Sequence, residues 1–440
     1  MNLLLIKNAT LVTLGENNRV LNHHDLLIEN GLIKDIYPSG SKHDLFSAKI
    51  IDAENKIVMP GFINLHTHFY SSFARGLAKV HPSKDFNEIL KNLWWKLDKE
   101  LTLEDTRLSA LTSIIDGIKK GTTTFIDHHA SPMNLTGSLD VIKKACRELG
   151  IRASLCYEVS DRDGDHIARL GLEENKNFIA TLDSKDEMVK GLMGLHASFT
   201  LSDQTLKTAG EIASALGVGC HIHTAEAMSD QEYTQKNYNM SVVERLSKFN
   251  ILGEQSICAH CTHLSDDEIK ILKDTDTAVV INHQSNMNNA VGVSDIKKIM
   301  DQEICVGLGT DAMTVNMLEE LRTSIWVQRL TSCDPNAGFM ECTHALTCNN
   351  AKIANRYFNN IGELKKGYKA DVIILSYNSP TSFNKDSFLG HLVFGLSNAT
   401  VETTIVAGTV LMENRKILIA DENVIFKSAQ IASQKLWERF

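Results

Sequence analysis

The middle of the chain alternates short apolar runs with longer amphipathic stretches. Continuous apolar runs are typical of strands buried on both faces, and amphipathic stretches between them are typical of helices covering a parallel sheet. Eight such runs predict an α/β fold, a (β/α)8 TIM barrel. The expected strands are 61–65, 122–127, 151–159, 191–196, 219–224, 256–260, 278–282 and 304–309. The expected helices include 106–119, 139–149, 202–216, 241–249, 265–273 and 318–329.

Both ends of the chain have β character instead. Short alternating segments predict strands at 3–6, 11–14, 25–29, 32–37 and 50–58, and later at 372–375, 403–406 and 409–412, before a helix over 421–440. At 440 residues the chain is long enough for one large domain and a smaller one. We therefore expect a first β-sandwich part over 1–58, the barrel over 59–350, and a second β-sandwich part with a C-terminal helix over 351–440.

Composition narrows the class of protein. Apolar residues at 43% and charged residues at 22% are ordinary for a soluble globular enzyme, and a net charge of −9 without a basic patch argues against nucleic acid as a partner. The N-terminal apolar run is too short for a signal peptide, and no stretch has the apolar length of a membrane span. The nine scattered cysteines are typical of reduced thiols, so we expect a cytoplasmic protein.

Two histidines, His66 and His68, stand two residues apart at the end of the first barrel strand. Residues i and i+2 of a strand point to the same face, so both imidazoles can reach one metal ion. Active sites of such barrels lie at the carboxyl ends of the strands. Further polar residues follow the fifth to eighth strands, namely His223 and Glu226, His260, His283, and Asp311.

Each of these residues also has an ordinary structural explanation. A histidine at a strand end is often a hydrogen-bonded pocket residue, Asp311 can cap the following helix, and Glu226 can be a solvated loop acid. Together they favour a metal site, because burying unpaired imidazoles and carboxylates costs free energy that a bound cation offsets.

The order of these motifs resembles the amidohydrolase superfamily. The segments that carry the resemblance are Pro60-Gly61-Phe62-Ile63-Asn64-Leu65-His66-Thr67-His68, His223-Thr224-Ala225-Glu226, His260-Cys261-Thr262-His263, His283 and Gly309-Thr310-Asp311. The likeness is greatest to the chlorohydrolase and deaminase branch, which includes guanine deaminase, and within it to SsnA-type aminohydrolases. It extends over nearly the whole chain, and it implies a composite β-sandwich built from both termini beside the barrel.

The resemblance also implies a site. One divalent ion, zinc more than iron, would be held by His66, His68, His223 and Asp311. The implied catalytic residues are Glu226, His260, His283 and Asp311, and the implied substrate contact is His196. Arg75, on the long segment after the first strand, is a further candidate for substrate binding. The fourth strand segment contains no lysine of the kind that bridges two metals, only Lys190 at its entrance, so we expect one ion.

The expected reaction is hydrolytic removal of ammonia from a heterocycle, possibly purine-like. A bound divalent ion lowers the pKa of its water and supplies hydroxide at neutral pH. The alternative hypothesis is hydrolysis of a cyclic amide, a formimino group or a chlorinated triazine. A third hypothesis is a non-catalytic binding scaffold. We expect a small-molecule substrate and a homodimer. The segments around His283 and after Asp311 depart from the family pattern, so the resemblance does not identify the substrate of this chain.

Overall fold

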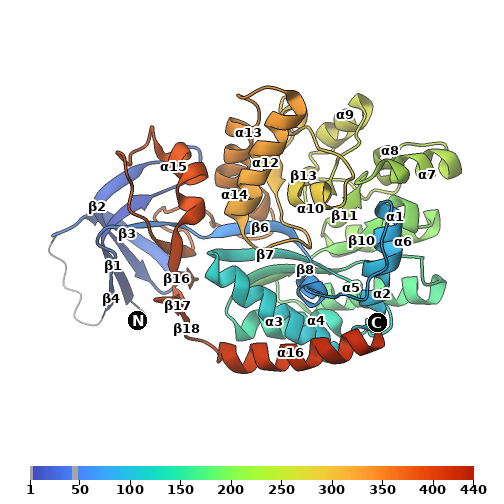
Figure 1. The fold of residues 1–440 in the computed structure, drawn as a ribbon, viewed down its shortest axis with the longest axis horizontal. Coiled ribbons are helices and arrows are strands. Elements are labelled where there is room, and N and C mark those ends of the chain that lie inside the picture. The colour runs from blue at the N-terminus through green and yellow to red at the C-terminus, as the bar shows by residue number, and fades with distance from the viewer. Residues whose placement is uncertain (1–2, 42–47) are drawn as a thin grey trace.

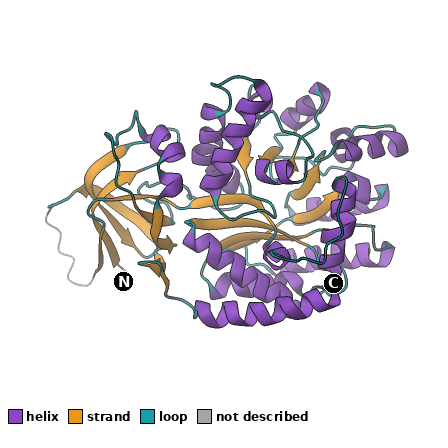
Figure 2. Ribbon diagram, in the orientation of Figure 1, coloured by secondary structure: helices purple, strands orange, loops and turns teal. Residues whose placement is uncertain are grey.

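The barrel forms as the sequence predicts. In this computed structural model, which describes residues 3–41 and 48–440, parallel strands surround a buried interior and helices cover their outer faces (Figures 1 and 2). The barrel strands are β6 (Phe62–Thr67), β7 (Thr122–His129), β8 (Arg152–Tyr157), β9 (Val189–Gly191), β10 (Met193–Ala197), β11 (Cys220–Thr224), β12 (Ile257–His260), β13 (Ala278–Ile281) and β14 (Val306–Leu308).

Two parallel sheets together close the barrel. One runs β6-β7-β8-β9 and the other β10-β11-β12-β13-β14. A parallel bridge between Val159 and Leu195 joins them on one side, and a bridge between Thr67 and Asp311 joins them on the other. The second bridge matters for function, because it places the end of the last strand directly beside the end of the first.

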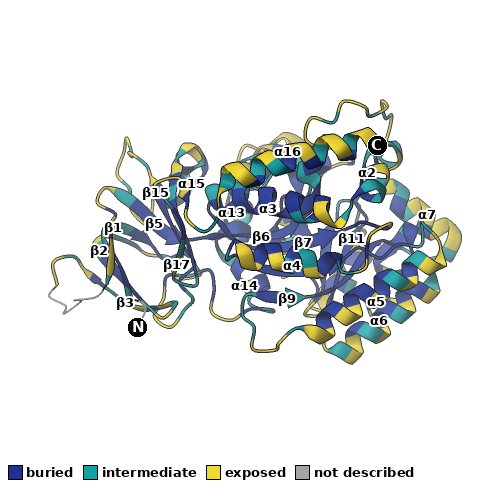
Figure 3. Ribbon diagram, turned by 90° about the horizontal axis from the view of Figure 1, so that it is seen from below, coloured by how far each residue is buried: buried dark blue, intermediate teal, exposed yellow. Residues whose placement is uncertain are grey.

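The helices follow the amphipathic stretches, and Figure 3 shows their yellow, exposed faces turned outward from the dark blue strands. Several begin with side-chain caps, such as the reciprocal pair of Ser265 and Glu268 at α9. The helices are α1 (Phe86–Ile89), α2 (Trp95–Glu100), α3 (Leu103–Lys119), α4 (Ser138–Glu148), α5 (Asp165–Thr181), α6 (Asp203–Leu216), α7 (Met228–Tyr238), α8 (Val242–Lys248), α9 (Asp266–Asp274), α10 (His283–Asn288), α11 (Ile296–Met300), α12 (Met317–Ser332), α13 (Phe339–His344), α14 (Asn350–Ala354), α15 (Phe388–Phe394) and α16 (Glu422–Arg439). None of the helices among the described residues is long and apolar enough to cross a membrane.

The two ends of the chain combine into one nine-stranded sheet beside the barrel (Figure 1). Parallel pairing of β1 with β5, and antiparallel pairing of β5 with β15, brings the N- and C-terminal segments together. A separate apolar cluster, which includes Ile6, Leu26 and Ile374, fills this unit. Its strands are β1 (Leu3–Val12), β2 (Val20–Glu29), β3 (Leu32–Pro38), β4 (Lys49–Asp52), β5 (Lys56–Pro60), β15 (Val372–Ser376), β16 (Thr400–Val406), β17 (Thr409–Glu413) and β18 (Lys416–Ile417).

Two details of this unit differ from the sequence expectation. The strands expected at 3–6 and 11–14 are one strand, β1, which ends at Val12. Its pairing with β2 is irregular between Ile6 and Leu11. The strand expected at 50–58 is two strands, because a turn at Ala53–Asn55 separates β4 from β5. Residues 1–2 and 42–47, part of the expected first segment, lie outside the described residues.

A long excursion after β6 covers the carboxyl end of the barrel. It contains two short helical turns, η1 (Phe69–Ala74) and η2 (Leu90–Trp94), together with α1 and α2. The C-terminal helix α16 packs beside α3 and holds this excursion, as Figure 1 shows. Trp437 donates a hydrogen bond of 2.7 Å to the carbonyl of Phe73, and Arg439 pairs with Asp105 at 2.6 Å. The last residues of the chain therefore help to position the cover of the site.

Candidate active site

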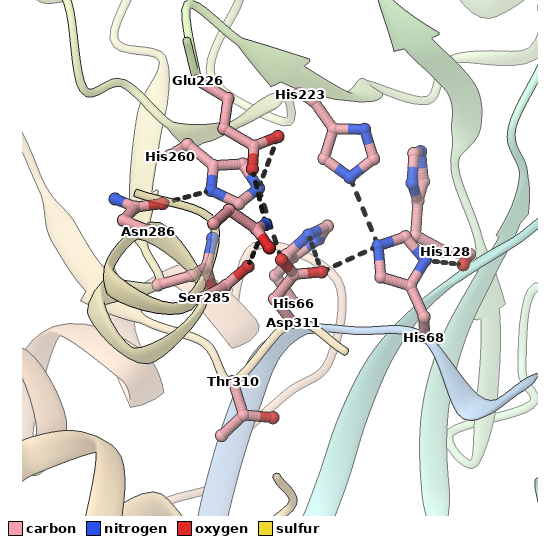
Figure 4. Close-up of polar contacts among 12 residues, drawn as sticks. His66, His68, His128, His223, Glu226, His260, Ser285, Asn286, Thr310 and Asp311 are labelled. Carbon is pink, nitrogen blue, oxygen red and sulfur yellow. Dashed lines mark hydrogen bonds and ion pairs between the residues drawn. The ribbon is translucent and has the colours of Figure 1, made fainter. Parts of the chain in front are cut away.

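Four predicted ligands converge at the carboxyl end of the barrel. His66 ends β6, His68 follows it, His223 lies on β11, and Asp311 follows β14. One ligand atom from each lies within 4.8 Å of every other, and all four residues are buried (Figure 4). Asp311 Oδ1 lies 3.0 Å from His68 Nε2 and 3.5 Å from His66 Nε2, and the Nε2 atoms of His68 and His223 are 3.3 Å apart.

Hydrogen bonds on the far side of each ring fix its orientation. His68 Nδ1 donates to the carbonyl of His128 at 2.5 Å, and His223 Nδ1 donates to the carbonyl of His196 at 3.0 Å. His66 Nδ1 contacts His221 Nε2 at 2.9 Å. All three Nε2 atoms therefore point to the centre of the group. Metal-binding histidines are typically held in this way by partners on the other nitrogen.

The donor set fits a divalent metal ion. His66 Nε2 is buried with no hydrogen-bond partner among the described residues, which is costly unless a cation takes its lone pair. Burial lowers the pKa of His66 to about 3 and that of His223 well below its ordinary value, so both rings are neutral ligands at pH 7. Three imidazoles and one carboxylate are a common set for zinc and related ions.

The backbone is strained where these side chains meet. Ala225, His260, Cys261 and Asp311 all have positive φ angles, between 46° and 71°, although none is glycine. Such conformations cost about 1–3 kcal/mol each and gather at functional sites, where surrounding structure enforces them. Asp311, one of these residues, lines the cavity.

A second group of acids and bases lies beside the ligands. His260 Nε2 is 3.7 Å from Glu226 Oε2 and 3.8 Å from Asp311 Oδ2, and its Nδ1 donates to Asn286 at 2.8 Å. Burial, together with the nearby Asp311 charge, raises the pKa of Glu226 to about 7 despite the opposing effect of His260. A carboxyl group with such a pKa can both give and take a proton near neutral pH.

The structure does not bring every predicted residue to this cavity. His196 does line it. The ring of His283, by contrast, contacts Ser324 at 2.9 Å and the carbonyl of Ser294 at 3.1 Å, and it is not among the cavity-lining residues. Arg75 is 69% exposed and pairs with Asp116 at 3.1 Å, outside the cavity.

The cavity has a wall that the sequence analysis missed. Glu158 follows β8, Arg162 lies a few residues later on the same loop, and Asp98 lies on α2; all three line the cavity. Arg162 pairs with Asp98, and its Nη1 atom is 3.9 Å from Glu158 Oε1. Glu158 stood inside the expected strand 151–159, and a charged residue near the end of this apolar run was its signal. Asp98 and Arg162 gave no such signal, because Asp98 lies on α2 and Arg162 on the loop after β8, away from strand ends.

The remaining lining is aromatic and polar. Trp94 and Trp95 both line the cavity. Trp95 Nε1 and Asp98 Oδ1 are buried without hydrogen-bond partners among the described residues. The complete lining is His68, Tyr70, Phe86, Leu90, Trp94, Trp95, Asp98, Glu158, Arg162, His196, His223, Glu226, Ser285, Asn289, Asp311, Ala312 and Met313.

A (β/α)8 barrel that gathers three histidines and one aspartate at its strand ends defines a class of metal-dependent hydrolases. The amidohydrolase family matches residues 57–411, and the chain belongs to that family. It is a hydrolase of carbon–nitrogen bonds other than peptide bonds. It is similar to a 5-methylthioadenosine/S-adenosylhomocysteine deaminase of Carboxydothermus hydrogenoformans, with 32% identity over 98% of both chains. It is also similar to a 5'-deoxyadenosine deaminase of Methanosarcina mazei, with 30% identity over 99% of both.

Solved structures share the fold at lower identity. An adenosine deaminase from Xanthomonas campestris with bound zinc matches with a TM-score of 0.86 and 20% identity over 98% of both chains. An atrazine chlorohydrolase from Arthrobacter aurescens complexed with zinc matches at 0.85 and 21%, over 98% of this chain and 100% of that one. Guanine deaminase of E. coli matches at 0.80 and 19%, over 94% and 99%. These structures confirm the predicted barrel with its added β unit.

Proposed function

We propose that this protein is a zinc-dependent aminohydrolase that removes ammonia from an amino-substituted heterocycle. The observation that carries the proposal is the convergence of four metal-type ligands with Glu226 in one buried cavity. The relatives that match nearly the full chain are named as deaminases of adenosine-type compounds, which supports the reaction class.

We assign one zinc ion to His66, His68, His223 and Asp311. When bound, it would lower the pKa of a water molecule and supply hydroxide for attack on a ring carbon. A single ion is favoured because Lys190, the lysine closest in sequence to β10, donates to the carbonyl of Ser184 at 3.1 Å on an exposed segment and does not enter the site.

The chain's own residues then handle the protons. Glu226 lines the cavity, and its Oε1 accepts a hydrogen bond of 3.4 Å from Asn289. It can protonate a ring nitrogen of the substrate and later the leaving amine, so that the carbon–nitrogen bond breaks and ammonia departs. His260, held by Asn286, can orient water and stabilise the charge that develops on oxygen.

Metal analysis and ammonia release test the proposal. Purified protein should contain about one equivalent of zinc and release ammonia from at least one amino heterocycle. Asp311→Asn should lower metal affinity by more than about 10- to 100-fold, which is the cost of losing only an outer partner that orients a ligand. Asp334→Asn, on an exposed turn, is the matched control and should leave both properties unchanged. Absence of metal and of turnover after zinc reconstitution would refute the proposal.

Glu226→Gln separates proton transfer from metal binding. The variant should keep its zinc, while kcat falls by about 10²- to 10⁴-fold because the proton donor is gone. Glu232→Gln, on the exposed face of α7, serves as control. A variant that retains full kcat would remove Glu226 from the mechanism.

We further propose a cytoplasmic homodimer, which the reduced cysteines and the family resemblance support. Light scattering on the purified protein measures the oligomeric state directly.

A further inference from the structure

Glu158 is a buried carboxylate whose partners do not satisfy it. The residue is 5% exposed and lines the cavity. His128 Nδ1, His196 Nε2 and Arg162 Nη1 lie 3.3, 3.6 and 3.9 Å from its oxygens. Within residues 3–41 and 48–440, no group donates a hydrogen bond of ordinary length and geometry to either oxygen. Its oxygens have cationic and imidazole neighbours but no such hydrogen bond, and they can accept one from a ligand in the cavity.

His128 does not supply that donor. Its Nε2 donates to the carbonyl of His221 at 3.2 Å, and a carbonyl can only accept. In the neutral ring, therefore, Nδ1 carries a lone pair and turns it toward Glu158. The Nδ1 atom is itself buried without a hydrogen-bond partner among the described residues.

Glu158 and Glu226 flank the ligand group from opposite sides. In Figure 4, Glu226 and His260 lie on one side of the four ligands and His128 lies on the other. Glu158 is adjacent to His128, and its ligand oxygen lies within 4.8 Å of the ligand nitrogens of His68 and His223. A ring carbon held at the centre therefore has a carboxylate on each side.

We propose that Glu158 is a specificity-determining residue that accepts N–H hydrogen bonds from the substrate, and that the substrate is a 2-amino heterocycle of the cyclic guanidine type. The inference rests on the proposed function and narrows it. In such a ring the reacting carbon has nitrogen on both sides. Glu226 reaches one ring nitrogen and the leaving exocyclic amine, while the N–H of the other ring nitrogen faces Glu158, which accepts its hydrogen bond.

Rings with the amino group elsewhere do not complete this arrangement. In a 4-aminopyrimidine or a 6-aminopurine, the atom on the second side of the reacting carbon is carbon and has no N–H. Glu158 would then receive no N–H donor from the ring beside the reacting carbon. Sites built around a buried polar group discriminate strongly against ligands that leave it unpaired. The relatives are named as deaminases of 6-aminopurine compounds, so the inference separates this chain from them.

Two pairs of isomers test the inference with the same leaving group and the same product. Isocytosine and cytosine both give uracil and ammonia, and guanine and isoguanine both give xanthine and ammonia. In each case water oxygen bonds to the ring carbon and the exocyclic C–N bond breaks. The zinc enzyme should show kcat/KM at least 100-fold higher for isocytosine than for cytosine, and for guanine than for isoguanine.

Glu158→Gln should remove the preference. We expect kcat/KM for the 2-amino isomers to fall at least tenfold, that for the other isomers to change less than threefold, and zinc content to stay at one equivalent. Glu173→Gln, on the exposed face of α5, is the matched control and should keep the preference. Isocytosine should also bind the zinc enzyme at least tenfold more tightly than it binds Glu158→Gln in calorimetry.

The outcomes distinguish this inference from the proposed function. A wild-type enzyme that prefers cytosine and isoguanine, or a preference unchanged in Glu158→Gln, overturns the inference and leaves the aminohydrolase intact. If none of the four rings releases ammonia, calorimetry decides the role of Glu158. Equal binding of isocytosine to both proteins then overturns it.

Discussion

Two buried arginine–aspartate pairs serve different purposes in this molecule. Arg152, at the start of β8, pairs with Asp371 through two contacts of 3.1 and 3.2 Å, and Asp371 also accepts from the backbone of Ala407 at 2.7 Å. Arg162 pairs with Asp98 through one oxygen of Asp98, while the other oxygen is buried without a hydrogen-bond partner among the described residues.

The two pairs differ in how many of the carboxylate oxygens accept a hydrogen bond. The first pair links the bottom of the barrel to the nine-stranded sheet, and both oxygens of Asp371 have donors. The second faces the cavity with unused hydrogen-bonding capacity, next to Glu158. A buried polar group that is fully paired stabilises the fold, whereas one left incomplete at a cavity wall is available to a ligand.

The largest expected effect comes from removing each arginine in turn. Arg152→Met leaves the Asp371 carboxylate buried without its cation and should lower the free energy of unfolding by about 3–5 kcal/mol. Urea denaturation measures this loss. Arg162→Met is the matched substitution and should cost less than half as much, because Asp98 faces a cavity and burial raises its pKa to about 7, so the carboxyl takes up a proton readily. Equal losses would show that the two pairs are equivalent.

Replacing each aspartate by asparagine separates stability from binding. Asp371→Asn loses a charge-assisted pair and should destabilise the protein by about 1.5–3 kcal/mol. Asp98→Asn should leave the melting temperature nearly unchanged and raise KM at least fivefold, with kcat altered less than twofold, because the lost acceptor faces the substrate. If Asp98→Asn instead lowers the melting temperature as much as Asp371→Asn does, the pair at the cavity is structural.

A buried carboxylate with no arginine makes the stability of the protein depend on pH. Glu320 accepts from the backbone of His283 at 2.6 Å, and burial raises its pKa from 4.5 to about 8. Between about pH 4.5 and pH 8, Glu320 stays protonated in the folded protein, whereas it is ionised in the unfolded chain. Stability contributed by Glu320 is therefore full below about pH 4.5 and falls as pH rises to about 8, by at most about 1.4 kcal/mol per pH unit.

Glu320→Gln should flatten that slope. Denaturation at pH 5.5 and 7.5 gives the change in unfolding free energy for each protein, and the change should be smaller in the variant. An identical change in both proteins would show that Glu320 does not hold its proton in the folded state.

The strand ends were the part of the site that could be predicted. His66, His68, His223 and Asp311 stand at the carboxyl ends of apolar runs, and a closed parallel barrel brings all such ends to one rim. The same rule did not place His283, since its ring turns from α10 toward Ser324 on α12. Nor did it place Arg75, whose guanidinium is exposed. Helix and loop positions have no fixed direction relative to the rim, so sequence alone does not orient them.

The sequence by itself determined the alternation of strands and helices, and with it the barrel and the place of His66, His68, His223, Glu226 and Asp311 near its strand ends. These features follow from hydrophobic periodicity and from residue types at strand ends, which are local properties. Only the tertiary structure decided which polar groups share the cavity. Asp98 lies on α2, whereas Glu158 and Arg162 lie on the loop after β8, and the three side chains meet only once packing has excluded water and fixed their neighbours.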